Sequence, residues 1–327
     1  TLDNALALID PTWGGVYQYS TQGGWGVPHY RKTMATQAGH LRLYALAYAQ
    51  LKDNRYKEAT HAIKCYVKNF MSADCGAFYS GQSDSIAGIN AMLFFSLSDI
   101  ERKKIGMPEI DKRILTRENG WMIEALATHY EYCDHQDSLT MAIRGADYIN
   151  QQCRNKSGGY VSHETASSAA YLMDTLAMAR ALLQLYRTTF DKQYLKQACQ
   201  SAGFIYRYFK NTVCGYNSKL SAKNETTTRR QIDENISLTR FANLLSYYSG
   251  DQQFAKMAKH GVRYLCIPEV ATARMEEAGI LLIDREIRST PLCITINGKK
   301  DSSSVNAFFK TAYQHAGWYK LVKFNPG

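Results

Sequence analysis

The sequence predicts an all-α fold of the (α/α)-toroid type, with short β elements in its loops and a small strand-helix tail. Two observations predict this fold. A pattern of two consecutive helices occurs four times along the chain, and a short glycine–aromatic element accompanies these helix pairs. Because helical hairpins with apolar stripes are stable only when they stack against one another, we expect the repeats to close into a ring around a central funnel.

Each repeat consists of an apolar helix that ends in aromatic residues, a turn that contains aspartate, and an amphipathic second helix. Aspartate is a good N-cap, because its carboxylate accepts hydrogen bonds from the free N–H groups of the following helix. The four aspartates expected to cap the second helices are Asp53, Asp134, Asp191 and Asp251. The first interval between them is the longest, which leaves room for an additional helix around residues 86–100.

The glycine–aromatic elements are W-G-G-V-Y at 13–17, G-A-F-Y at 76–79, G-G-Y at 158–160 and C-G-Y at 214–216. Glycine permits a tight turn. The aromatic residue that follows is expected either to pack inward or to line the surface that the turn faces.

The C-terminal segment has a different pattern. A β-branched run at 291–301 contains an Asn-Gly turn signal, and a helical stretch follows at 304–314. We therefore expect a toroid domain over residues 1–290 and a small strand-helix tail, packed on the toroid, over residues 291–327.

Composition and charge exclude several classes of partner. The chain is 45% hydrophobic and 21% charged, which is typical of a globular protein. No segment approaches the roughly 18 apolar residues that span a bilayer, so we expect no membrane partner. The net charge of +10 is dispersed and accompanies no reading motif, so we expect no nucleic acid. A cytoplasmic location is favoured, or a periplasmic or secreted one if Thr1 is a processed N-terminus.

The eight cysteines are scattered along the chain. None belongs to a C-x-x-C pair or another zinc spacing, so we expect no metal and no cofactor. Buried thiols are the simplest interpretation, and a disulfide or two is the alternative if the protein is exported.

Four stretches together carry a resemblance to a known family. They are the run at 14–34, which includes G-G-V-Y-Q-Y-S and W-G-V-P-H-Y-R-K-T-M, then G-A-F-Y-S at 76–80, I-L-T-R-E-N-G-W-M-I at 114–123, and L-L-Q-L-Y-R-T-T-F-D-K-Q-Y-L at 182–195. Over nearly its whole length the chain resembles the helical region of bacterial YyaL-like and animal spermatogenesis-associated proteins.

The resemblance implies a six-hairpin, glycosidase-like toroid similar to those of N-acylglucosamine 2-epimerases and unsaturated-uronide hydrolases. The N-terminal thioredoxin-like domain of this family has no counterpart in the present sequence, so the resemblance implies no redox activity. The family usually has acidic or amide residues at positions occupied here by Arg31, Thr36 and Gln37.

Candidate acids and bases lie in loops or at the starts of first helices, where they could converge at one mouth of the funnel. A glycosidase needs two carboxylates, about 5–5.5 Å apart for retention or about 6.5–9.5 Å apart for inversion. An epimerase of this fold class uses histidines that titrate near neutral pH. Caps and solvated loop residues are the alternative interpretation. The catalytic candidates are Asp84, Glu118, Glu164, Asp174, His29 and His163.

Sugar binding favours flat aromatic faces beside hydrogen-bonding groups, although aromatic residues also fill gaps between helices. Arg31, together with Lys32, favours an anionic ligand such as a sugar acid or a phosphosugar. The ligand-binding candidates are Trp13, Tyr17, Trp25, Arg31, Gln37, Asn119, Trp121 and Asn235.

Two functions remain open from the sequence. The first is a toroid whose funnel binds a carbohydrate-like, anionic small molecule, and as an enzyme it would be a glycoside hydrolase or a sugar epimerase. The alternative is a non-catalytic toroid that binds a protein partner or serves in assembly. The replaced positions Arg31, Thr36 and Gln37 favour this alternative.

Overall fold

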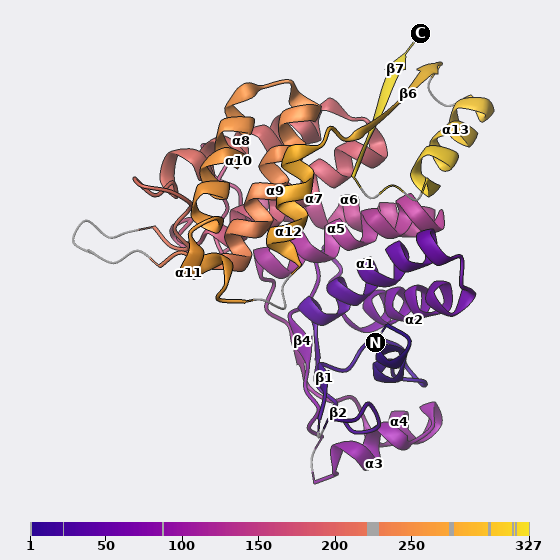
Figure 1. The fold of residues 1–327 in the computed structure, drawn as a ribbon. Helices are drawn as coiled ribbons and strands as arrows, with labels where there is room; N and C mark the ends of the chain where they lie inside the picture. Colours follow the sequence, from indigo (N-terminus) through magenta and orange to yellow (C-terminus); the bar gives the residue numbers. More distant parts are fainter. Residues whose placement is uncertain are drawn as a thin grey trace. The chain divides into compact units, whose positions relative to one another are not determined.

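The computed structural model describes residues 2–21, 23–86, 88–220, 229–274, 278–299, 302–315, 317 and 319–326. The chain divides into two compact units, Thr1–Gln151 and Gln152–Gly327 (Figure 1). The expected boundary between a toroid and a tail, at residues 290 and 291, lies within the second unit and stays a prediction. None of the helices in the described ranges combines the length and the apolar content needed to cross a membrane.

The first unit contains two helical hairpins. They are α1 (Met34–Leu51) with α2 (Asn54–Phe70), and α5 (Thr116–Cys133) with α6 (Gln136–Gln152). Helix α1 packs against both α2 and α5, and Figure 1 shows α1 beside α5. The other elements are η1 (Asn4–Leu8), β1 (Tyr19–Ser20), β2 (Pro28–His29), β3 (Lys32–Thr33), β4 (Gly81–Gln82), α3 (Ala91–Ser96), α4 (Asp99–Ile105) and β5 (Ile110–Asp111).

The second unit contains two further hairpins. They are α7 (Leu172–Thr189) with α8 (Lys192–Tyr208), and α9 (Ile232–Ser249) with α10 (Gln252–Leu265), and α7 packs against α9. The four predicted helix pairs are therefore confirmed. The unit continues with α11 (Pro268–Ala271), α12 (Gly279–Arg288), β6 (Leu292–Gly298), α13 (Ser303–Gln314) and β7 (Lys320–Pro326).

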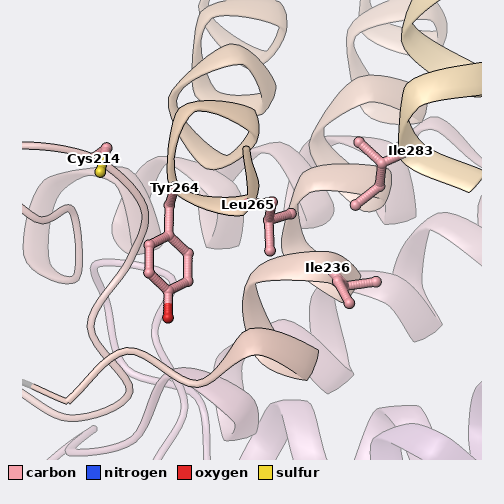
Figure 2. Close-up of a cluster of buried hydrophobic side chains, with 5 residues drawn as sticks. All are labelled: Cys214, Ile236, Tyr264, Leu265 and Ile283. Atoms are coloured by element: carbon pink, nitrogen blue, oxygen red, sulfur yellow. The ribbon is translucent and has the colours of Figure 1, made fainter. Parts of the chain in front are cut away.

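Buried side chains fix α12 against the last hairpin. Figure 2 shows Ile236 of α9, Leu265 of α10 and Ile283 of α12 gathered in one cluster with Cys214 and Tyr264. Burying such side chains stabilises a protein by about 1.5–3 kcal/mol each. The cluster therefore holds the amphipathic α12 against α9 and α10.

The predicted strand and helix of the tail are confirmed as β6 and α13, and the sequence missed β7. Strands β6 and β7 pair in parallel along their whole length. The ammonium of Lys320 is buried at the end of α13, where it donates hydrogen bonds to the carbonyls of Ala312, Tyr313 and His315 at 2.5–3.0 Å. A cation at this position satisfies carbonyls that the last helical turn leaves without partners.

Three of the four predicted aspartate caps are confirmed. The carboxylates of Asp53, Asp191 and Asp251 each accept a hydrogen bond from the backbone N–H two residues later, at 2.8–2.9 Å. The prediction for Asp134 was wrong. Asp134 is the C-cap of α5, with φ 59° and ψ 40°, and His135 stands directly before α6.

The C-caps of the four first helices all adopt the left-handed conformation, at Lys52, Asp134, Phe190 and Gly250. This conformation costs a residue with a side chain about 1–2 kcal/mol.

Lys52 is exposed, so Lys52→Gly should raise the free energy of unfolding by about 0.5–1 kcal/mol, measured by denaturant titration. The reverse change at the equivalent position, Gly250→Lys, should lower it. A Lys52→Gly protein less stable than the parent would contradict this account of the cap.

The extra helix predicted around residues 86–100 is present as two short helices, α3 and α4, instead of one. Ser98 interrupts the helical pattern, because its side chain caps α4 in a reciprocal capping box with Glu101. The interruption follows from the strong preference of serine for the N-cap.

The glycine–aromatic elements are four copies of one tight turn. In each copy the turn closes with an isolated antiparallel bridge before its aromatic or apolar residue enters the core. The bridges are Ile9↔Val16, Ser72↔Phe78, Arg154↔Tyr160 and Lys210↔Tyr216. Of the two expectations for the aromatic residue, inward packing is the one observed, because Phe78, Tyr160 and Tyr216 are buried, and Val16 is buried at the equivalent place of the first copy.

The fourth residue of each first helix holds the preceding turn by its backbone. In the first unit, Gln37 accepts a hydrogen bond from the N–H of Val16 at 2.7 Å and donates to its carbonyl at 2.8 Å. Asn119 accepts from the N–H of Phe78 at 2.8 Å and donates to its carbonyl at 3.0 Å. We name this arrangement the turn clamp.

The same clamp occurs in the second unit. Asn235 accepts from the N–H of Tyr216 at 2.8 Å and donates to its carbonyl at 2.9 Å. Thr175 makes the first of these two hydrogen bonds, in which its hydroxyl oxygen accepts from the N–H of Tyr160 at 3.0 Å. Because the clamp residues are fully buried and their polar groups are bonded to backbone, the structure corrects the expectation that Gln37, Asn119 and Asn235 contact a ligand.

Candidate functional site

His29 and Asp84, two of the predicted catalytic residues, lie close together in the first unit. The Nε2 atom of His29 is 3.7 Å from Oδ2 of Asp84. His29 ends β2, which pairs with β1 so that Tyr19 stands opposite, and the two rings stack at 4.9 Å with planes 20° apart. Asp84 follows β4 by two residues. Two loop segments therefore bring a base, an acid and an aromatic face to one place.

The pair is accessible to solvent. The side chains of His29 and Asp84 are 35% and 36% exposed, and Tyr19 is half exposed. The Nδ1 atom of His29 is buried and makes no hydrogen bond within the described ranges. A carboxylate beside an imidazole orients the ring and holds a proton on the facing nitrogen. This arrangement is suited to general acid–base catalysis.

Positive charge gathers at the neighbouring end of β5. Arg113 donates hydrogen bonds from Nε and Nη2 to the carboxylate of Asp111, at 2.5–3.0 Å. These bonds, and more weakly the charge of the exposed Arg31, hold the pKa of Asp111 below its usual value. Asp111 is therefore a counter-ion for arginine rather than a proton donor at neutral pH.

The start of α5 presents the next predicted residues. Nη2 of Arg117 lies 2.9 Å from Oε1 of Glu118, and the guanidinium also covers the ring of Trp121, with its carbon 5.2 Å from the ring centre. Glu118 is thus paired with a cation, and one face of Trp121 is occupied by the same side chain. Trp25 is half-buried in the loop between β1 and β2.

Trp13 and Tyr17 lie in the core, which corrects their assignment to ligand binding. Both are buried in a cluster with Phe94 and Phe95. The indole N–H of Trp13 donates to Oδ1 of Asp99 at 2.9 Å. Aromatic side chains at the start of a loop therefore fill the interior here.

This aromatic cluster encloses a buried ion triad of Asp10, Lys32 and Arg102. Lys32 Nζ and Arg102 Nη1 both donate to Oδ2 of Asp10 at 2.7 Å. Burial opposes ionisation of Asp10, but the two cations, Lys32 foremost, hold its pKa below the usual value. Burial lowers the pKa of Lys32 to about 8 against the attraction of Asp10. Lys32 was expected beside Arg31 at the ligand, and its complete burial shows that this expectation was wrong.

The second unit holds the remaining predicted catalytic residues. The hydroxyl of Ser162 donates to Oδ2 of Asp174 at 2.6 Å, and Asp174 is buried in the first turn of α7. His163 is exposed in the preceding loop, where its Nδ1 lies 2.9 Å from the hydroxyl of Thr165. Glu164 is exposed beside it. These catalytic assignments stay predictions.

The sequence did not single out Asp111, Arg113 or Ser162. The spacing of Asp111 and Arg113 was a usable signal, because residues two positions apart in an extended segment project from the same side. No comparable signal marked Ser162, whose partner is brought to it by the turn at the start of α7.

A cavity of about 420 Å³ lies elsewhere in the first unit, between the end of α2, the turn after it and α6. Its charged lining residues are Lys68, Asp74, Asp137 and Arg144. The predicted site residues are not among those that line it. Within the described ranges, no group of three His, Cys, Asp or Glu side chains is placed to hold a metal ion.

Comparison with known proteins supports the fold. A family model described as β-L-arabinofuranosidase, GH127 catalytic domain, matches residues 118–259. A search of curated protein sequences found no match.

Solved structures resemble the chain over most of its length. A cellobiose 2-epimerase from Bacillus thermoamylovorans is 13% identical with a TM-score of 0.66, covering 88% of this chain and 82% of that one. A cellobiose 2-epimerase from Spirochaeta thermophila is 17% identical with a TM-score of 0.63, covering 81% and 67%. A family 76 glycoside hydrolase (mannosidase) from Bacteroides thetaiotaomicron is 12% identical with a TM-score of 0.59, covering 80% and 68%. The predicted fold is thus confirmed: the chain is an α/α toroid of the glycosidase-like type.

Proposed function

We propose that the chain binds a carbohydrate and acts on it by acid–base chemistry centred on His29 and Asp84. The observation that carries the proposal is the 3.7 Å approach of these two accessible side chains beside the exposed ring of Tyr19. An aromatic face suits the apolar side of a sugar ring. Arg31, close enough to Asp111 to lower the pKa of that carboxyl, favours a sugar that carries a carboxylate or a phosphate.

Two reactions fit this site. In an epimerisation the accessible carboxylate of Asp84 would accept a proton from carbon, and Nε2 of His29, 3.7 Å away, would assist by exchanging that proton with the carboxylate. The structural likeness to two cellobiose 2-epimerases supports this reaction. In a glycoside hydrolysis two carboxylates would act across the bond, with Asp84 and Glu118 as the candidates of this unit. The match to a β-L-arabinofuranosidase family model supports the second reaction. Trp25 and Trp121 are proposed ligand contacts in either case.

For the second unit taken by itself, we propose His163 and Glu164 of the loop before α7, with Asp174 in the first turn of α7, as acid–base candidates. We also propose that the chain is related to the helical region of the YyaL-like and spermatogenesis-associated proteins, on the strength of the four stretches described above. The fold is compatible with this relation and supports it at the level of the toroid.

A sugar panel in D₂O tests the reaction class. The protein is incubated with neutral and acidic disaccharides and with aryl glycosides, including an α- and a β-L-arabinofuranoside, and the products are followed by ¹H NMR. Exchange of a carbon-bound proton for deuterium indicates epimerisation, and release of a monosaccharide or an aglycone without such exchange indicates hydrolysis. Asp84→Asn should slow the reaction by about 10²-fold or more, and His29→Gln by about 10–100-fold.

His61→Gln, a change of an exposed histidine of the same unit, is the matched control and should leave the rate unchanged. Turnover that survives both His29→Gln and Asp84→Asn in folded protein would contradict the assignment of the site.

The non-catalytic alternative is favoured by a specific observation. Three side chains expected at a ligand are bound to backbone in turn clamps, and Glu118 and Asp111 are paired with arginines. On this alternative the toroid binds a protein partner. A sugar panel without turnover or binding, together with a stoichiometric complex with a protein, would favour it.

A further inference from the structure

Cys65 and His61 form a thiol–imidazole pair on α2, outside the site described above. They are four residues apart and so occupy the same face of the helix on successive turns. The Sγ atom of Cys65 lies 3.4 Å from Nε2 of His61, within reach of a hydrogen bond from the thiol to the ring. His61 is exposed and Cys65 is half-buried, so a small reagent can reach the sulfur.

His61 is the outermost of three neighbouring imidazoles. The rings of His129 and His135 stack at 4.8 Å, and the ring of His61 lies 6.3 Å from that of His135. Burial lowers the pKa of His129 to about 3, and burial also lowers that of His135. The inner two rings are therefore neutral at pH 7, and neither carries a charge that would repel a proton placed on His61.

The charged residues of α2 around the pair include Lys57, Glu58, Lys64 and Lys68. Lys68 lies one turn beyond Cys65, and its ammonium is 3.1 Å from the carboxylate of Asp137 at the start of α6. Lys64, on the same helix, is bound to the same carboxylate. Glu58 is exposed two turns before Cys65.

Other thiols of the chain serve as internal standards for the reactivity of Cys65, because they are either buried or exposed without a neighbouring imidazole within the described ranges. Burial raises the pKa of Cys133 and of Cys199 to about 11, so these thiols are protonated at neutral pH. Three thiols are exposed but have no imidazole nitrogen within hydrogen-bonding distance in the described part of the chain: Cys75, Cys266 and Cys293.

We propose that Cys65 is a modification site at which a low-molecular-weight disulfide forms a mixed disulfide with the protein. The thiol proton passes to Nε2 of His61, and the thiolate attacks one sulfur of the disulfide. A new S–S bond forms as the old one breaks, and the leaving thiolate takes the proton from His61 and departs as a free thiol. No other oxidant is required, because the disulfide supplies both the bond and the leaving group.

Reaction of the folded protein with oxidised glutathione at pH 7 tests the proposal. After quenching with acid, the mixed disulfide at each cysteine is quantified by peptide mass spectrometry against time. Cys65 should react about 10-fold faster than Cys75, Cys266 and Cys293, because the thiolate is the attacking form and Cys65 alone of these four has an imidazole nitrogen beside it among the described residues. His61→Gln should bring the rate at Cys65 down to that of the exposed thiols and leave theirs unchanged.

Two results would overturn the proposal: a rate at Cys65 in the parent protein no higher than at the three exposed thiols, or an unchanged rate in His61→Gln. The buried Cys153 and Cys214 report the state of the fold, since they should stay unmodified in both proteins. If His61→Gln unfolds the chain, all eight thiols will react alike, and the comparison among thiols of the parent protein decides the question.

Discussion

Replacing Asp10 with asparagine should lower the free energy of unfolding by about 3–5 kcal/mol, the largest effect expected from any single change in this chain. Asp10 is the only carboxylate bonded to Lys32 and Arg102 in the buried triad of the described residues. Asparagine keeps the shape but removes the negative charge. The ammonium charge of Lys32 and the guanidinium charge of Arg102 would then remain buried beside carbonyl oxygens and aromatic faces, without a carboxylate.

The matched control is Asp137→Asn. Asp137 also lies between two cations, Lys64 and Lys68, but its side chain is 42% exposed whereas that of Asp10 is fully buried. The control should cost no more than about 1 kcal/mol. Guanidinium titration followed by tryptophan fluorescence suits both variants, because Trp13, Trp25 and Trp121 lie in the first unit. An equal decrease in the free energy of unfolding in the two variants would show that burial does not decide how much the triad contributes to stability.

Asn119→Ala should produce the second largest loss, because it removes a complete turn clamp. The backbone N–H and carbonyl of Phe78 would both lose their partner inside the protein. Each buried polar group left without a hydrogen bond costs about 1–3 kcal/mol, so a loss of about 2–5 kcal/mol is expected. Phe78 precedes β4 and Asp84 along the chain, so the candidate site should also lose order.

Thr175→Val provides a graded comparison at the equivalent position of α7. Only one hydrogen bond is lost there, from the N–H of Tyr160, so a loss of about 1–2 kcal/mol is expected. Amide hydrogen exchange gives a local readout, since the Phe78 amide should lose protection in Asn119→Ala and the Tyr160 amide in Thr175→Val. Full protection of Phe78 in the alanine variant would contradict the clamp.

The helical repeat was readable from sequence because it depends on local signals. Apolar periodicity, aspartate caps and glycine turns act within a few residues, and they placed all four hairpins. Asp134 shows the limit of such signals. It stands one residue too early to cap α6, and only the left-handed end of α5, which leaves His135 before α6, reveals the shift.

The candidate site was harder to predict because residue type does not report burial. Asn119 and Asn235 look like ligand-binding amides in the sequence, yet each is used to hold a turn brought from an earlier part of the chain. Lys32 looks like the neighbour of Arg31, yet Lys32 is fully buried whereas Arg31 is exposed. His29 and Asp84 were named separately, and the strand pairing of their loops brings them together.

Binding of an anionic sugar at the His29 site is the claim on which the proposed function depends most. A thermal-shift titration with neutral sugars, sugar acids and phosphosugars tests it directly. The account predicts stabilisation by one anionic class, worth roughly 2.7 kcal/mol at a hundred times the dissociation constant. The shift should be lost in Arg31→Ala and kept in Lys104→Ala, a control that removes an exposed cation from α4. A shift that survives Arg31→Ala, or no shift with any sugar of the panel, would contradict it.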